Sequence, residues 1–126
     1  MNAGDTFRRQ HGEHLRVIIS DPEVDPGSVL AVSFTTVRNR PWEDTTCILR
    51  PGDHPFIKKR SLVSYADATL HTNAELEAEP AAGRIQVLDP VSDELLARIH
   101  EGAKNSPRMR FGYQQLLEQQ GLIQLD

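Results

Sequence analysis

The amino-acid sequence predicts a mainly β domain with helices at its C-terminal end. Before about residue 90, five or so short apolar runs rich in β-branched side chains alternate with turn residues such as proline, glycine and aspartate. Helical spacing of apolar residues begins only after that point. Since no long helix separates the runs, they suit a small barrel or a highly bent sheet better than a parallel α/β sheet.

A single domain is expected over residues 1–126, with the barrel over about 4–90 and the helical part over about 91–121. The length allows one buried core without disulfides or a structural metal. The lone Cys47 cannot form an internal disulfide, which favours a reducing compartment, and we expect a cytoplasmic protein. No apolar run approaches the roughly 18 residues of a membrane span, and the N-terminus lacks the regions of a signal peptide, so no membrane partner is expected.

The first two predicted strands follow one another. Residues 15–20 form a β-branched run closed by Asp21 and Pro22, the pattern of a buried strand that ends in a turn. Residues 29–37 predict a second strand after a loop. Its better core face consists of four alternating side chains, Leu30, Val32, Phe34 and Thr36.

Three further strands are predicted over residues 45–49, 62–65 and 85–88. Pro51 stops the first of them. Between the other two, the acidic residues 73–82 are interpreted as a loop or a weak helix.

Two helices complete the chain. Asp89-Pro90 or Ser92 can cap the first helix, which ends by residues 105–107. Its apolar face has helical spacing and consists of Leu95, Leu96, Ile99 and Ala103. The second helix is expected from about 108 to 120, with one side formed by Tyr113, Leu116 and Leu117.

The chain carries a net charge of −4, but the charge changes sign along it. Residues 38–60 hold six basic and three acidic side chains, whereas residues 67–101 hold two basic and eight acidic ones. One interpretation is two solvated faces of opposite sign. The other is an anionic ligand that binds only the basic side.

No strong local motif for catalysis is present. The sequence lacks glycine-rich phosphate loops, HExxH and GxSxG. His11 and His14 are expected to be a surface pair rather than a metal site, since no partner pair accompanies them. Cys47 lies in an apolar strand pattern and is interpreted as a small buried side chain rather than a nucleophile. We expect neither a metal nor a cofactor.

Four residues are candidates for chemistry on an anion. His54 lies in a turn beside Asp53 and near three consecutive cations, which suits proton transfer, or else a hydrogen-bonded turn residue. Arg16 opens a strand, where it can brace a phosphate or form a rim salt bridge. Thr35 and Thr36 end the next strand, where their hydroxyls can bind a phosphate or simply suit β structure.

Five segments follow one another in an order that resembles the PemK/MazF-like growth-inhibitor toxins, small intracellular ribonucleases of toxin–antitoxin pairs. Residues 4–6, Gly-Asp-Thr, are similar to the opening of that family. Residues 15–20, 31–36 and 61–65 resemble its Arg-Pro-apolar-Ser, apolar-Pro-Ile-Thr-Ser and Ser-x-Val strands. The helix from about Ser92 takes the place of its C-terminal helix.

The resemblance implies an SH3-like barrel with a terminal helix, usually dimeric, that cuts single-stranded RNA without a metal and is restrained by an antitoxin protein. Arg16 would take the place of the family arginine that stabilises charge on the cleaved phosphate, and Thr35 that of the active-site threonine. The chain departs from the family in two ways: no proline follows Arg16, and residues 64–69 lack the acidic-Gln-x-Arg pattern that would add a second arginine.

RNA cleavage needs a base, an acid and a cation, and we assign proton transfer to His54, charge stabilisation to Arg16 and phosphate positioning to Thr35. The residues expected to hold the RNA backbone are Thr36, Arg38, Arg40, Lys58, Lys59 and Arg60. A base could stack on Trp42, Phe56 or Tyr65, although the last two also suit a core. The leading expectation is a toxin-like endoribonuclease with single-stranded RNA, an antitoxin and a second copy as partners. The alternatives are a non-catalytic module of the same fold that binds RNA or a protein, and a thiol enzyme that uses Cys47.

Overall fold

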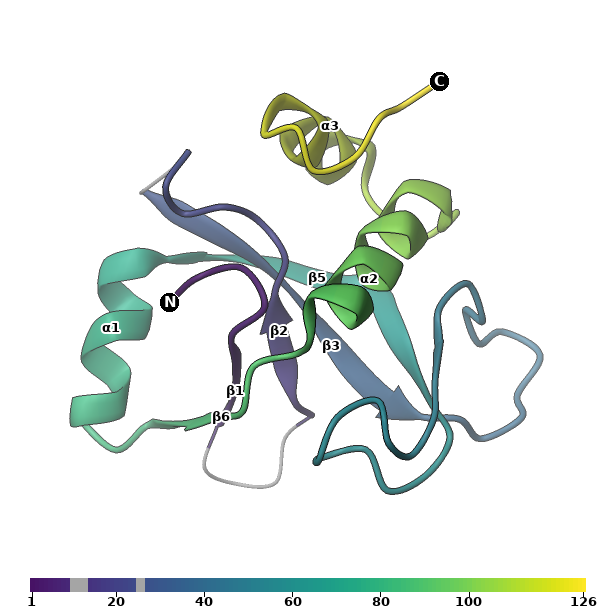
Figure 1. Ribbon diagram of the computed structural model, residues 1–126, viewed down its shortest axis with the longest axis horizontal. Coiled ribbons are helices and arrows are strands. Elements are labelled where there is room, and N and C mark those ends of the chain that lie inside the picture. The colour runs from purple at the N-terminus through teal and green to yellow at the C-terminus, as the bar shows by residue number, and fades with distance from the viewer. Residues whose placement is uncertain (10–13, 25–26) are drawn as a thin grey trace.

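The computed structural model describes residues 1–9, 14–24 and 27–126, so His11 lies outside the described residues (Figure 1). The strands are β1 (Thr6–Arg9), β2 (Arg16–Ile18), β3 (Ser28–Thr36), β4 (Ile48–Leu49), β5 (Ser61–Thr72) and β6 (Ile85–Leu88). The helices are α1 (Asn73–Ala81), α2 (Asp93–Asn105) and α3 (Phe111–Gln119). This confirms the mainly β class with helices at the C-terminal end. None of the helices in the described ranges is long and apolar enough to cross a membrane.

The six strands form one antiparallel sheet in the order β4-β5-β3-β2-β1-β6. The described parts of β4 and β6 pair only with β5 and β1, so the sheet stays open at both edges. The small SH3-like barrel that we expected is therefore not confirmed. The reason is that β4 has only two residues and does not reach β6.

Strand lengths differ from the sequence prediction where side chains or tertiary pairing intervene. β4 is shorter than the predicted 45–49 because the Asp44 carboxylate accepts hydrogen bonds from Thr46 and folds this stretch into a turn. β5 is much longer than the predicted 62–65 because β3 pairs with it at both ends. β1, which the apolar pattern does not reveal, lies between β2 and β6 in the sheet.

A bulge interrupts β5 at its centre. Ala31 pairs with Thr69 and Ser33 pairs with Ser64, so residues 65–68 of β5 stand opposite Val32 alone. Within the bulge, the side chains of Tyr65 and Ala68 are buried, whereas those of the two residues between them are exposed. The bulge thus turns two residues of a central strand outward.

Each face of the sheet carries its own apolar cluster. The larger cluster joins alternating β3 side chains, including Leu30 and Phe34, to α2 and α3. The smaller cluster lies on the other face, where Phe7 and Ile18 pack with Leu76 of α1. Figure 1 shows α1 and α2 on opposite sides of β1 and β2. The sequence predicted only the larger cluster. Both faces of β3 are apolar, but the element that packs on the second face is an acidic helix, which carries no clear apolar signal of its own.

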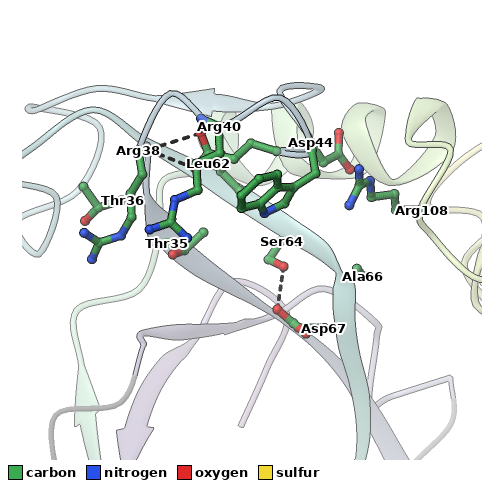
Figure 2. A pocket seen from close by; sticks show the side chains of 12 residues that line it. Thr35, Thr36, Arg38, Arg40, Asp44, Leu62, Ser64, Ala66, Asp67 and Arg108 are labelled. Atoms are coloured by element: carbon green, nitrogen blue, oxygen red, sulfur yellow. Dashed lines mark hydrogen bonds between the residues drawn. The ribbon is translucent and has the colours of Figure 1, made fainter.

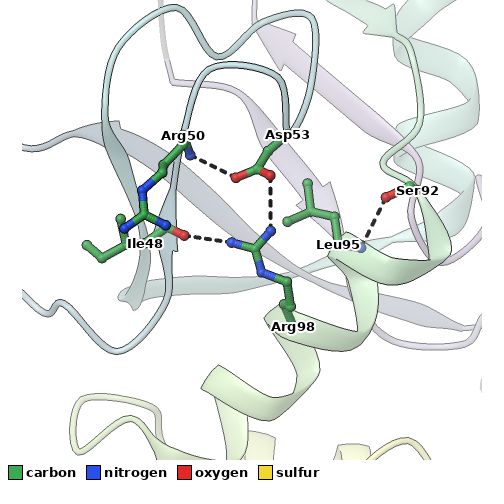
Figure 3. Close-up of polar contacts among 6 residues, drawn as sticks. All are labelled: Ile48, Arg50, Asp53, Ser92, Leu95 and Arg98. Carbon is green, nitrogen blue, oxygen red and sulfur yellow. Dashed lines mark hydrogen bonds and ion pairs between the residues drawn. The ribbon is translucent and has the colours of Figure 1, made fainter.

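Helix α2 begins and packs as predicted. The Ser92 hydroxyl accepts a hydrogen bond from the Leu95 N–H at 3.1 Å and caps the helix (Figure 3). Leu95, Ile99 and Ala103 are buried against the sheet. The second helix begins at residue 111 rather than 108, because the Ser106 hydroxyl accepts the Arg108 N–H and shapes a turn.

Arg98 joins α2 to the loop that follows β4. Its guanidinium donates to the carbonyl of Ile48 at 2.8 Å and to the carboxylate of Asp53 at 3.1 Å, as Figure 3 shows. Asp53 also accepts the Arg50 N–H at 2.8 Å. Burial acts to raise the pKa of Asp53, but the hydrogen bonds from Arg50 and Arg98 outweigh burial and hold that pKa below its usual range. The loop and the helix are therefore fixed to each other by a charged pair.

Gly102 lets α2 approach β5 closely. Its hydrogen atoms face Tyr65, whose hydroxyl donates to the Ile99 carbonyl at 2.8 Å. A Cβ at position 102 would collide with that hydroxyl and would lie 3.0 Å from the Cβ of Cys47. The helix can occupy this position only because residue 102 has no side chain.

We expect Gly102→Ala to lower the free energy of unfolding by about 1–3 kcal/mol, the usual cost of overpacking a core. Gly112→Ala is the matched control, since a Cβ there would meet nothing within 4 Å and alanine favours a helix. Urea unfolding followed by circular dichroism measures both. Equal effects of the two substitutions would contradict the close packing of α2 on Tyr65.

A second prediction concerns acid stability. His100 in α2 donates from Nε2 to the Ile19 carbonyl at 2.7 Å, and burial lowers the pKa of His100 below its usual 6.5 despite that hydrogen bond. Because the unfolded chain then binds a proton more readily than the folded one, His100 costs no stability above about pH 6.5 and destabilises the fold as the pH falls below it.

The unfolding free energy of the wild type should therefore fall more steeply between about pH 7.5 and 5.5 than that of His100→Gln, whose amide can still donate to Ile19. Urea titrations at the two pH values measure the difference, and His14→Gln, at an exposed position, is the control. Identical pH dependence in the wild type and His100→Gln would refute the prediction.

Candidate functional site

Three adjoining pockets form one continuous groove on the surface. Thr35 and Thr36 line both the first and the third pocket. Ala66 and Asp67, which the β5 bulge turns outward, line both the first and the second. His14 lines both the second and the third. We call this surface the basic groove after its seven basic side chains, Arg16, Arg38, Arg40, Lys58, Lys59, Arg108 and Arg110.

Strand pairing brings Arg16 and Thr35 to the same face of the sheet. Arg16 on β2 lies opposite Ser33 on β3. Side chains two positions apart on a strand share a face, so Thr35 lies on the side of Arg16 and roughly 7 Å further along β3. The Arg16 guanidinium donates to the Thr69 hydroxyl at 3.2 Å, which orients it across the sheet. The arginine and threonine that the sequence singled out are therefore neighbours in the structure.

The first pocket is framed by basic side chains from two distant segments. Figure 2 shows Arg38 and Arg108 at opposite ends of it, with Ser64 and Asp67 between them. Arg38 follows β3, whereas Arg108 belongs to the connection between α2 and α3. Arg110 of the same connection lines the second pocket.

Two of the acidic side chains in the groove bind groups of their own segment. Glu43 accepts hydrogen bonds from the backbone N–H groups of Arg38 and Arg40, both at 2.9 Å. These bonds, that of Arg38 foremost, hold the pKa of Glu43 below its usual range. Asp67 accepts the Ser64 hydroxyl at 2.7 Å. Both carboxylates are thus engaged within their own loop or strand.

Asp44, the third carboxylate, connects the loop after β3 to the C-terminal end of α2. It accepts hydrogen bonds from Thr46 in the loop and from the Ser106 hydroxyl at the helix end. Burial acts to raise the pKa of Asp44, but these hydrogen bonds outweigh burial and lower it. Asp44 therefore stays ionised while it fixes the position of the loop.

The basic side chains of the groove form no close ion pairs within the part of the chain that the structure describes. None of their charged nitrogens lies within 4.0 Å of a carboxylate oxygen, although the charges of Arg40 and Arg108 still help to lower the pKa values of Glu43 and Asp44. The groove lining holds seven basic and three acidic residues, although the whole chain carries a net charge of −4. A basic surface of this kind attracts an extended polyanion.

His54 does not line the three pockets of the basic groove, but its own pocket adjoins the third of them through Phe56 and Lys58. It is 4% exposed and lines an apolar pocket beside Val87. Its Nδ1 accepts the Phe56 N–H at 3.0 Å, and its Nε2 donates to the Asp89 carbonyl at 2.6 Å. A neutral imidazole has one donor and one acceptor, so both are used. The structure therefore favours the turn role for His54 over the proton transfer that we assigned to it from the sequence.

His14 is the histidine that the groove contains. The Phe34 N–H donates to the Leu15 carbonyl at 2.9 Å, which continues the pairing of β2 and β3 beyond Arg16. In that register His14 stands beside Thr35. Its exposure agrees with the sequence prediction. Its place beside the groove has no local signal in the sequence, because it results from the pairing of two strands.

The other predicted residues divide between the groove and the rest of the surface. Thr36, Arg38, Arg40, Lys58 and Lys59 line the groove, whereas Arg60 is exposed outside its lining. The sequence analysis missed Arg108 and Arg110, which it placed inside the second predicted helix, whereas in the structure both precede α3.

Cys47 is a buried core residue, as predicted. It is 6% exposed and lies against the α2 position that Gly102 occupies. Burial raises the pKa of its thiol, which disfavours the thiolate that a nucleophile needs. The arrangement gives no support to a thiol enzyme.

The described residues contain no group of three or more histidine, cysteine or carboxylate side chains that could hold a metal ion. Comparison of the chain with models of protein families, with curated proteins and with solved structures found no match.

Proposed function

We propose that this chain is a toxin-like endoribonuclease that binds single-stranded RNA in the basic groove and cleaves it without a metal ion. The observation that carries the proposal is the concentration of seven basic side chains, without a close ion pair among the described residues, around Arg16 on β2 and Thr35 on β3 in a chain that is acidic overall. The resemblance of five segments to the PemK/MazF-like toxins supports the same function. It also implies a cytoplasmic setting, an antitoxin protein and a second copy of the chain as partners.

In the proposed reaction, the ribose 2′-hydroxyl attacks the adjacent phosphorus and the bond to the 5′ oxygen breaks. His14 accepts the proton of the 2′-hydroxyl, and the leaving oxygen takes a proton from the solvent. Arg16 stabilises the negative charge that develops on the phosphoryl oxygens, and the Thr35 hydroxyl donates to the same phosphate. The products are a 2′,3′-cyclic phosphate and a free 5′-hydroxyl.

The proposed function also implies that this open sheet is a variant of the SH3-like barrel of the toxin family. The bulge in the long strand β5 and the packing of α2 across the adjoining strands support that relation. In this interpretation, the barrel is opened at the edges formed by β4 and β6.

A second candidate function is a non-catalytic module that binds RNA through the same groove. The exposure of His14 favours it, because a catalytic base usually lies in a more enclosed site where water is excluded. The two functions share the binding surface and differ in whether the RNA is cut.

The cleavage prediction is tested with mixed-sequence single-stranded RNA in EDTA. The wild type should release fragments that end in 2′,3′-cyclic phosphate. Arg16→Ala should slow cleavage by about 10²–10³-fold, as removal of an oxyanion donor does, and His14→Ala by about 10²–10⁴-fold. Arg84→Ala, which removes an exposed arginine outside the groove, should cleave like the wild type.

Gel analysis of end-labelled RNA measures these rates. Cleavage that EDTA abolishes would refute the metal-independent mechanism. Binding without cleavage, over several RNA sequences, would instead establish the non-catalytic module.

RNA binding itself should depend steeply on salt. With a 2′-O-methyl RNA, which lacks the attacking hydroxyl, a plot of log K against log[salt] should have a slope of about −0.7 for each phosphate neutralised. Arg38→Ala and Arg108→Ala should each make that slope shallower by about 0.7, because each removes one cation that neutralises a phosphate. The two arginines lie at opposite ends of the first pocket. Arg84→Ala should leave the slope unchanged, and a flat plot for the wild type would show that the basic side chains of the groove do not neutralise RNA phosphates.

A further inference from the structure

The side chain of Trp42 is large and mostly apolar, yet it is exposed to solvent. Trp42 is the only tryptophan of the chain, and 59% of its surface is accessible. Its indole adds nothing to either apolar cluster. A large apolar side chain left in water lacks the stabilisation that burial would provide, and the groups around Trp42 indicate which kind of ligand would cover it.

The loop that carries Trp42 is fixed in place. The Glu43 carboxylate binds the backbone N–H groups of Arg38 and Arg40 on the preceding side. On the following side, Asp44 binds the Ser106 hydroxyl at the end of α2. The backbone on both sides of Trp42 is thus held before any ligand arrives, so that little conformational entropy is lost when its ring is covered.

Trp42 is also surrounded by groups that bind phosphate. It lines the first pocket of the basic groove together with Arg38 and Arg108. The guanidinium of Arg40 lies over the indole ring, 5.4 Å from its centroid. A flat aromatic surface flanked by arginines that form no close ion pair with any described residue matches a nucleotide, whose base stacks while its phosphates bind the cations. An apolar peptide would leave these arginines desolvated and unpaired.

We propose that Trp42 is a stacking platform for an unpaired nucleobase in the first pocket of the basic groove, and that it selects single-stranded over double-stranded RNA. The inference rests on the proposed RNA-binding function. In a duplex, both faces of each base are covered by its neighbours, and the base is not free to stack on the indole. A base in a single strand can leave its neighbours and stack there at little cost.

The test uses a fluorescein-labelled 2′-O-methyl RNA of about twelve nucleotides, within the usual range of single-strand sites. A second strand of equal length carries abasic sugars in place of nucleotides. Anisotropy titrations give Kd for the wild type, Trp42→Ala and Trp42→Phe. Phe111→Ala is the control, because Phe111 is 64% exposed on α3 and lies outside the groove lining.

Trp42→Ala should weaken binding of the normal strand by about 5- to 100-fold, whereas Trp42→Phe and Phe111→Ala should stay close to the wild type. Against the abasic strand, the wild type and Trp42→Ala should bind equally weakly, since no base is present to stack. The emission of Trp42 should change with the normal strand and not with the abasic one. A blunt duplex of the same sequence should bind the wild type and Trp42→Ala equally.

Two results would overturn the inference. If Trp42→Ala binds the normal strand as the wild type does, with the salt dependence intact, the stacking role fails while RNA binding in the groove stands. If Trp42→Ala weakens both strands equally, the indole supports Arg40 and does not stack a base. Absence of any binding at low salt would remove both this inference and the proposed function.

Discussion

The contact between α2 and Tyr65 is the constraint on which the rest of the structure depends. Tyr65 belongs to the bulge of β5, and its ring enters the core because Gly102 leaves room for it and the Ile99 carbonyl accepts its hydroxyl. Burial at this contact raises the pKa of Tyr65, so its hydroxyl remains a donor. With Tyr65 fixed inward, Ala66 and Asp67 turn outward at the centre of the basic groove. The core and the floor of the groove are therefore set by the same packing.

The groove gathers its charge from segments that are distant in sequence. β2, the loop after β3 and the connection between α2 and α3 each contribute arginines. The acidic side chains nearby bind backbone and hydroxyl groups, and among the described residues none of them forms a close ion pair with the arginines of the groove. An acidic chain thereby presents a positive surface. For the proposed RNA ligand, this arrangement would support both attraction and orientation.

Preorganisation connects the fold to the proposed chemistry. Asp44 fixes the loop after β3 to the end of α2, and Arg98 fixes the loop after β4 to the middle of the same helix. Buried side chains hold α2 on the sheet, so α2 in turn fixes both loops relative to the sheet. Groups that bind a phosphate act best when their geometry is set before the ligand arrives, since no reorganisation is then needed.

The sequence by itself determined the elements whose signals are local. Short runs of apolar and β-branched residues located β2, β3 and β6, and the Ser92 cap with apolar spacing located α2, because these patterns depend only on the residues themselves. It also singled out Arg16 and Thr35, which strand pairing makes neighbours. Only the tertiary structure decided that the sheet is open and that both ring nitrogens of His54 form hydrogen bonds. It also decided that the groove is lined by His14, Arg108 and Arg110. These features arise from contacts between residues far apart in the chain, and such contacts leave no periodic pattern in a single sequence.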